Sequence, residues 1–286
     1  MKSRRAVTLI EVLVAIGIVA LLIGITIPAI QKVRESALRT KSTNNVRQIM
    51  LGMHNFAAAH GNTMPGRTSW ADSNYQHIDE NIPIYITIAS YLEVNVDRSS
   101  FDPDKPETML VPVYMDPGDP SWLANPTLTD TRTQGYCSYP INVWAFGGAN
   151  RNAPAGYPDG MSHTIGIGGH YMRCGKGPRS QSIWDLAFGP PDSERRRATF
   201  ADPWYKDVVP KNDPARGLTI PSVLGKTFQA RPSLDECDPS VAQTPYRAGL
   251  IVGMMDGSSR TIRPSVAIGV FWAAVTKDGN EVIDLD

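Results

Sequence analysis

The sequence has no excess of charge of either sign. Lys and Arg together number 28 in 286 residues, and Asp and Glu also number 28, so the formal net charge is zero. Since proteins that bind nucleic acid usually carry a basic surplus, this balance argues against a nucleic-acid partner. The chain also lacks the glycine patterns of a P-loop or a dinucleotide-binding turn. We therefore expect neither a nucleic-acid partner nor a cofactor.

Charge is also missing from one long stretch near the N-terminus. No charged residue occurs from Val12 to Ile30. As a helix this stretch would be about 28 Å long, close to the hydrocarbon thickness of a bilayer. A helix in a soluble core needs an apolar surface on one side only. The stretch therefore predicts a single membrane-spanning helix over residues 12–30.

A cleaved signal peptide is the alternative interpretation of the same stretch. The apolar run is long for a signal peptide, and no small-residue cleavage site follows it. Charge does not fix the topology, because basic residues flank the stretch on both sides. They are Lys2, Arg4 and Arg5 before it, and Lys32, Arg34, Arg39, Lys41 and Arg47 after it.

The helical pattern continues beyond the apolar stretch. Val46, Ile49, Met53 and Phe56 recur at three- and four-residue spacing, which is typical of an amphipathic helix. Gly61 and Pro65 then supply a stop. We expect one helix to about residue 60, followed by a globular domain over residues 61–286, since neither a repeat nor a long linker divides that region.

The globular region shows short, irregular signals. Residues 82–93 fit a buried helix or a strand, whereas residues 110–115 and 164–172 predict strands. Residues 249–262 predict a hairpin with Asp256-Gly257 at its turn, and residues 264–275 predict a short helix. The expected fold class is α+β, with the long helix packed on a mainly antiparallel sheet that carries long loops.

Catalytic and metal-binding signals are weak. Ser162-His163 and His170 lie near Asp159 in the sequence, but no nucleophile elbow accompanies them. A structural turn is the favoured interpretation, and we expect no enzyme. The acidic tail offers weak calcium candidates without the full spacing of a calcium loop, so no metal site is expected. These candidates are Asp278, Asn280 and Asp284. Arg195–Arg197 predicts an exposed loop.

The N-terminal segment RRAVTLIEVLVAIGIVALLIGITIPAI resembles the leader and first helix of type IV pilins and type II secretion pseudopilins. The resemblance implies that a prepilin peptidase removes residues 1–6 by cutting between Ala6 and Val7 and then methylates the Val7 amine. Ala6 and Val7 replace the usual glycine and phenylalanine. Glu11 matches the family's glutamate, which would pair with the Val7 amine of a neighbouring subunit. Pro28 matches the proline that kinks the family's helix.

The same resemblance implies a location and a topology. The protein would lie in the inner membrane, with the leader on the cytoplasmic side and residues 61–286 in the periplasm or outside the cell. Its partners would be the prepilin peptidase, copies of itself and other pilin-like subunits.

A second resemblance covers nearly the whole chain. The motifs YMDPGDPS, DGMSHT, YMRCG and YRAGLIVGMMDGSSR occur in the order seen in prepilin-leader proteins with a large C-terminal domain of unknown function. That family ends in a signature of a histidine, nine residues and Asp-Gly. Asp256-Gly257 matches it, whereas Tyr246 stands at the histidine position.

The three cysteines of the chain are an odd number for an exported domain, where pairing is expected. Cys174 and Cys237 lie in motifs where the second family carries cysteines, so the resemblance implies that these two pair. Cys137 would then remain free.

The function expected from these features is structural. The chain would be a subunit of a membrane-rooted pseudopilus or pilus-like filament that serves type II-like secretion. A membrane-anchored binding module that does not polymerise is the alternative. An exported hydrolase is a third, weaker interpretation.

Overall fold

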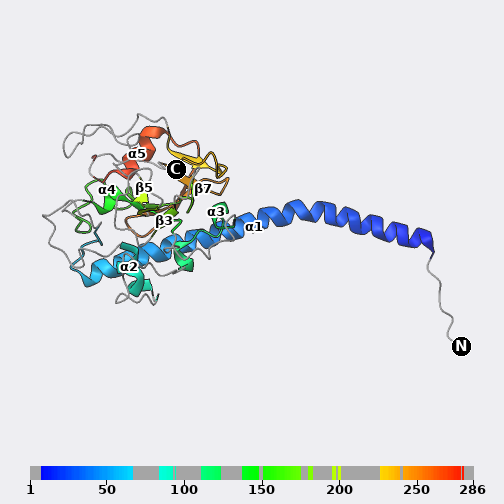
Figure 1. The fold of residues 1–286 in the computed structure, drawn as a ribbon, viewed down its shortest axis with the longest axis horizontal. Coiled ribbons are helices and arrows are strands. Elements are labelled where there is room, and N and C mark those ends of the chain that lie inside the picture. The colour runs from blue at the N-terminus through cyan, green and yellow to red at the C-terminus, as the bar shows by residue number, and fades with distance from the viewer. Residues whose placement is uncertain are drawn as a thin grey trace.

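A computed structural model of the chain shows a globular domain with one long helix that extends far beyond it (Figure 1). The structure describes part of the sequence. The described residues are 8–66, 84–92, 94, 111–123, 137–147, 151–174, 180–182, 195–197, 199–200, 226–238, 241–277 and 279.

Helix α1 (Leu9–Ala59) is continuous over 51 residues. Thr8 caps its N-terminus, and the left-handed Gly61 (φ 64°) follows its end. The predicted kink at Pro28 does not break the helix, which passes through this proline with the gentle curve visible in Figure 1. The N-terminal half of α1 is exposed, and its first buried residue is Ser42. Only the second half of α1 therefore belongs to the domain.

A five-stranded sheet in the order β5-β1-β2-β8-β9 lies against this second half. The strands are β1 (Ile141–Asn142), β2 (Ile165–Gly168), β5 (Thr199–Phe200), β8 (Leu250–Met254) and β9 (Ser259–Ile262). All neighbours pair antiparallel except β1 and β5, which are parallel. This arrangement confirms the predicted α+β class with a long helix on a mainly antiparallel sheet.

Strand β8 is buried on both faces, because α1 covers one side of the sheet and helix α5 (Ile268–Val275) packs on the other. Ile251 belongs to the core beneath α1, whereas Val252 belongs to the core beneath α5. Gly253 permits the close approach of α1, since a Cβ there would lie 2.7 Å from Cγ of Met50 and 2.8 Å from Cγ1 of Ile167.

The remaining elements are short. Helices are α2 (Ile84–Ala89), α3 (Pro120–Leu123) and α4 (Val143–Phe146), with 3-10 turns η1 (Ser90–Leu92) and η3 (Pro112–Tyr114). Two parallel pairs lie outside the main sheet: β3 (Ser180–Ser182) with β4 (Arg195–Arg197), and β6 (Phe228–Ala230) with β7 (Ala242–Thr244).

Two local predictions were wrong. The strand expected over residues 110–115 is the 3-10 turn η3, because Pro112 lacks the N–H that a strand ladder needs and its fixed φ suits the first turn of a helix. The loop expected at Arg195–Arg197 is strand β4. The hairpin and the C-terminal helix are present, and the ambiguous segment at residues 82–93 is helical where it is described.

Candidate functional site

The first part of the site is the N-terminus of α1. The Thr8 hydroxyl accepts a hydrogen bond from the Glu11 N–H (3.4 Å), and Glu11 Oε2 accepts from both the Thr8 N–H and the Thr8 hydroxyl (2.8 Å each). This reciprocal pattern is a capping box. It ties Glu11 to the start of the helix in the uncleaved chain. Ala6 and Val7 lie outside the described residues.

The apolar half of α1 is exposed on all sides, because no described part of the domain packs against it. Its large side chains from Leu9 (76% exposed) to Val33 (68% exposed) contact no described part of the domain. Within the described part of the chain, α1 is the one helix long and apolar enough to cross a membrane. Figure 1 shows this half extending away from the domain as a free rod. Such a surface needs lipid or neighbouring helices around it.

The second part of the site is a buried polar cluster that holds the other half of α1 to the domain, which we call the Asp116 cluster. Its members are Ser42, Asp116, Tyr139 and Tyr246. The Asp116 carboxylate accepts hydrogen bonds from the Ser42 hydroxyl (3.0 Å), the Gly118 N–H (2.8 Å) and the Tyr246 hydroxyl. The Tyr139 hydroxyl donates to Ser42 (2.9 Å). Residues from four distant stretches of the chain thus meet at α1.

Burial changes the acidity of this cluster. Desolvation raises the pKa of Asp116 to about 6, and nearby Asp119 also raises it, whereas the hydrogen bonds from Tyr246, Gly118 and Ser42 lower it. Desolvation also raises the pKa of Asp119, although the Ser121 N–H (2.9 Å) and the Met172 N–H (2.8 Å) donate to that carboxylate. Both carboxyl groups hold backbone segments together in the interior.

The geometry gives the Tyr246-to-Asp256 interval a structural role. The Tyr246 hydroxyl lies 3.2 Å from the Leu38 carbonyl oxygen, and the Met255 carbonyl oxygen lies 2.9 Å from Nε2 of His54. Leu38 and His54 are about 24 Å apart along α1. The interval, which contains strand β8, spans this distance, so its two ends hold α1 at two separate points. Gly257, with φ 88°, makes the turn that follows.

The sequence signal for the Asp116 cluster was only partial. In Asp116-Pro117-Gly118 and Asp119-Pro120-Ser121, each Asp side chain accepts from the N–H two residues later, as turn-forming Asp residues often do. That pattern indicates turns. It does not indicate that both carboxyl groups are buried or that Ser42 and Tyr246 meet one of them.

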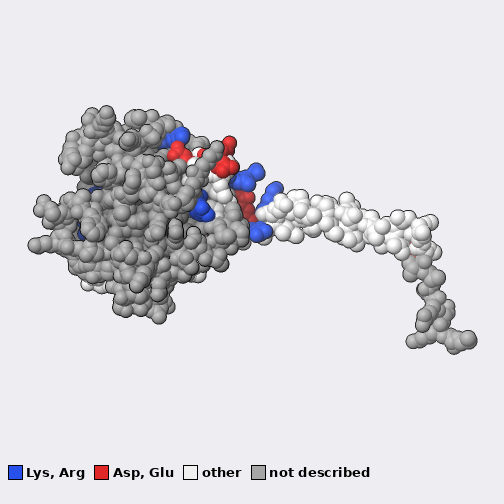
Figure 2. Space-filling model, viewed as in Figure 1, with Lys and Arg blue, Asp and Glu red and all other residues white. Residues whose placement is uncertain are grey.

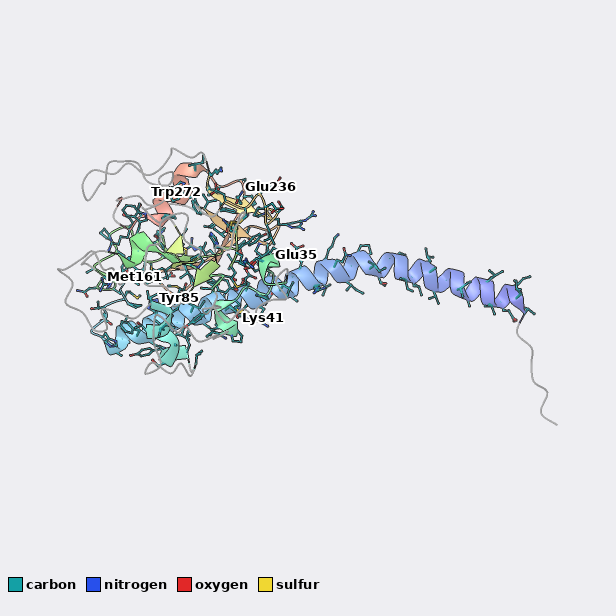
Figure 3. All side chains as sticks on the ribbon, viewed as in Figure 1. Glu35, Lys41, Tyr85, Met161, Glu236 and Trp272 are labelled. Atoms are coloured by element: carbon teal, nitrogen blue, oxygen red, sulfur yellow. A yellow bond between two sulfur atoms is a disulfide. The ribbon has the colours of Figure 1, made fainter. Side chains whose placement is uncertain are left out.

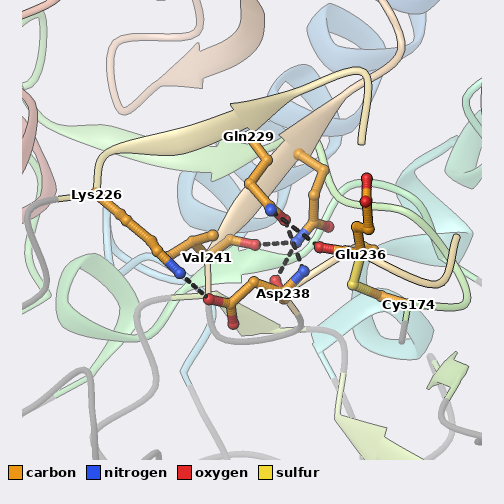
Figure 4. Close-up of polar contacts among 8 residues, drawn as sticks. Cys174, Lys226, Gln229, Glu236, Asp238 and Val241 are labelled. Atoms are coloured by element: carbon orange, nitrogen blue, oxygen red, sulfur yellow. Dashed lines mark hydrogen bonds and ion pairs between the residues drawn. A yellow bond between two sulfur atoms is a disulfide. The ribbon is translucent and has the colours of Figure 1, made fainter. Parts of the chain in front are cut away.

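A disulfide joins Cys174 and Cys237, which are 63 residues apart, and Cys137 is free and buried. Figure 4 shows the hydrogen bonds around this disulfide. The Asp238 N–H donates to Oε1 of Gln229 (2.6 Å), and Lys226 forms an ion pair with Asp238 (2.8 Å). Burial raises the pKa of the Cys137 thiol to about 12, so this thiol stays protonated and unreactive near neutral pH.

The residues that suggested a catalytic triad do not all come together. The Ser162 hydroxyl lies 3.2 Å from Nδ1 of His163. Asp159, however, accepts from the Gly279 N–H (2.9 Å), and Nδ1 of His170 lies 2.6 Å from the Tyr171 carbonyl oxygen. Among the described residues, no group of three or more His, Cys, Asp or Glu could hold a metal ion. The calcium candidates Asp278, Asn280 and Asp284 lie outside the described residues.

Comparison with known families gives two matches. A family described as "Protein of unknown function (DUF1559)" matches residues 31–185, and the "Prokaryotic N-terminal methylation motif" matches residues 1–27. No curated protein and no solved structure matches the chain. The methylation motif and the bare apolar helix together identify a membrane-anchored, pilin-like protein with a prepilin-type leader.

Proposed function

The chain belongs to the DUF1559 family and carries a prepilin-type methylation motif, and from this premise we propose that it is a structural subunit of a membrane-rooted pseudopilus. Type II-like protein secretion is the process that such a pseudopilus would serve. The observation that carries the proposal is the division of α1 into a bare apolar half and a half fixed in the domain.

That division suits assembly through helices. The bare half is long enough to span the membrane, and its sides are free to pack against the same half of other copies. The fixed half is held by the Asp116 cluster and by the core beneath α1, so each domain follows its own helix as a rigid attachment. Bundled helices would then form the filament centre, with domains on the outside.

Glu11 is the residue that we propose to order this bundle. A carboxylate at the edge of an apolar span costs up to a few kcal/mol unless it has a partner. In the uncleaved chain its partner is Thr8. Cleavage before Val7 would create an amine beside that carboxylate, and the Val7 amine of a neighbouring subunit would then pair with Glu11.

We also propose that the leader lies in the cytoplasm and that the domain lies outside the inner membrane. The Cys174–Cys237 disulfide supports this topology, because such bonds persist in oxidising compartments. A catalytic role is not part of the proposal. Hydrolysis of ester, peptide or glycan substrates by the wild type but not by Ser162→Ala would overturn that exclusion.

The first experiment measures the N-terminus and intact mass of the protein from its own membranes, together with its recovery in filaments sheared from cells. A methylated Val7 terminus with recovery in the polymer is the expected result. A chain that begins at Met1 and stays monomeric would favour a membrane-anchored binding module instead. A chain that begins beyond Ile30 would identify a signal peptide and overturn the proposal.

A matched pair of variants tests the role of Glu11. Glu11→Gln should still be cleaved and methylated but should be lost from the filament fraction. Thr8→Val removes the capping hydroxyl and keeps the carboxylate, so its filament recovery should stay close to that of the wild type. Unchanged recovery of Glu11→Gln would contradict the proposed pairing.

A further inference from the structure

The end of the domain from which α1 emerges carries exposed basic side chains on both the helix and the domain. Figure 2 shows Lys and Arg residues gathered where the helix leaves the domain. Four exposed cations that the contacts below place at this end are Lys32, Arg34, Arg247 and Arg263. Within the described part of the chain, none of the four forms an ion pair. We call these four residues the basic collar.

The helix fixes the height of two of these cations above the membrane. Lys32 and Arg34 lie about 3 and 6 Å beyond Ile30 along the helix axis, whereas the headgroup layer extends about 5–7 Å beyond the hydrocarbon. They also lie on nearly opposite sides of α1, about 160° apart. Both side chains therefore stand at headgroup depth.

Three contacts place the domain's two cations, Arg247 and Arg263, at nearly the same height. The Arg247 N–H donates to Oε1 of Glu35 (3.2 Å), which sets this turn about 8 Å beyond Ile30. Arg47 donates to the Ser259 hydroxyl (2.8 Å), and Arg39 donates to the Thr261 hydroxyl (3.2 Å).

These contacts give the direction of β9, which runs toward the apolar half of α1 as its residue numbers rise. Arg263 directly follows β9 and so continues toward the membrane.

Carboxylates also lie at this end of the domain, and Figure 2 shows acidic side chains beside the basic ones. Glu35 is half-buried and accepts from the Arg247 backbone. Asp235 and Glu236 are exposed, and Figure 3 shows Glu236 at the end of the domain from which α1 emerges. Within the described part of the chain, however, none of these carboxylates forms an ion pair with a cation of the collar.

We propose that the basic collar binds the anionic headgroups of phospholipids and holds the domain of the unassembled subunit against the membrane surface. Each cation within a Debye length of an anionic surface adds to this attraction, which salt weakens. The inference requires the membrane anchor but not the filament, so it can fail or succeed independently of the proposed polymer.

The test uses the full-length chain in vesicles. Ala248 is exposed beside Arg247, and an Ala248→Cys variant offers one accessible thiol, because Cys174 and Cys237 are paired and Cys137 is buried. Energy transfer from a fluorophore on this thiol to labelled headgroups reports the distance of the domain from the membrane. Vesicles of phosphatidylcholine alone are compared with vesicles that contain phosphatidylglycerol.

Transfer should be higher in the phosphatidylglycerol vesicles and should fall to the phosphatidylcholine level in 1 M salt. The double variant Arg247→Gln/Arg263→Gln should lower the ratio of docked to undocked domain by about fivefold for each arginine. The matched control Lys41→Gln/Arg260→Gln removes the same charge farther from the membrane and should lower it much less. Lys32 and Arg34 stay unchanged because they flank the membrane span.

Three results would overturn the proposal. One is equal transfer in the two kinds of vesicle, and another is an equal loss in the control variant. The third is transfer that follows the protein-to-lipid ratio instead of the lipid charge, which would identify other copies of this chain as the partner of the collar.

Discussion

Asp116 is the residue whose environment differs most clearly from what its sequence context suggests. Asp116 is 5% exposed, and its carboxyl group is held by donors from α1, from its own turn and from Tyr246. Within the described residues no cation pairs with it. The ionised form is therefore costly in the folded protein.

This cost predicts a pH dependence. The pKa of Asp116 rises from 3.8 to about 6 on folding, so the folded state binds the proton more tightly than the unfolded state. The contribution of Asp116 to stability is then greatest below pH 4 and falls as the pH rises through 6, by about 3 kcal/mol in total once the pH is near 7. Urea unfolding of the full-length protein in detergent, followed by near-ultraviolet circular dichroism, measures the free energy of unfolding between pH 4 and 7.

Asp116→Asn should remove this component, so its free energy of unfolding should fall less than that of the wild type between pH 4 and 6. Asp119 remains in both proteins, although its interaction with the charge of Asp116 is absent from the variant. Parallel curves for the two proteins would contradict the raised pKa.

Tyr246 gives a second prediction at this scale. Tyr246→Phe removes the hydroxyl that donates to Asp116, and leaving a buried carboxylate with one donor fewer should cost about 1–3 kcal/mol. Tyr171→Phe is the control, since no described residue forms a hydrogen bond with the Tyr171 hydroxyl, and it should change stability by less than about 0.5 kcal/mol. Equal effects in the two variants would show that the contact with Asp116 contributes nothing.

At the scale of elements, the close packing of α1 on β8 depends on Gly253. Gly253→Ala would place a methyl group within 3 Å of Met50 and Ile167, and overpacking of this kind costs about 1–3 kcal/mol. Gly269→Ala is the matched control in α5, where a Cβ would meet no atom within 4 Å. The control should be neutral or stabilising by up to about 1 kcal/mol. Thermal unfolding of both variants measures the difference, and equal melting temperatures would refute the packing argument.

Elements with a strong local pattern could be predicted from the sequence. The stripe from Val46 to Phe56 follows the helical period, and Asp256-Gly257 has the chemistry of a hairpin turn, so both were identified correctly. The strand predicted at residues 110–115 was wrong, because the prediction gave more weight to the apolar composition of this segment than to Pro112, which lacks the N–H that a strand needs. The Asp116 cluster could not be predicted, since Ser42 and Tyr246 are brought to Asp116 by tertiary packing alone.

At the scale of the whole molecule, the structural boundary lies within α1. A chain that lacks residues 1–33 keeps every buried residue of α1, so it should be a soluble, folded monomer. A chain that lacks residues 1–47 loses Ser42, Asn45 and Val46, and it should be unfolded because the core beneath α1 is opened and Asp116 loses a donor. Near-ultraviolet circular dichroism and gel filtration distinguish the two.

Two results would contradict this boundary. They are a folded protein without residues 1–47, and aggregation of the protein without residues 1–33. The expected domain boundary at residue 61 would also separate the domain from the α1 residues in its core, so a fragment of residues 61–286 should not fold.

The pairing of α1 with β8 and β9 joins the beginning of the chain to its end. His54 and Met255, which form one of these contacts, are 201 residues apart. The ribosome must therefore complete nearly the entire polypeptide before the face of α1 that packs on β8 and β9 can be covered, and contacts this distant slow folding. Throughout synthesis this amphipathic surface remains open to aggregation, so newly made chains should depend on a chaperone that shields it until the last hairpin arrives.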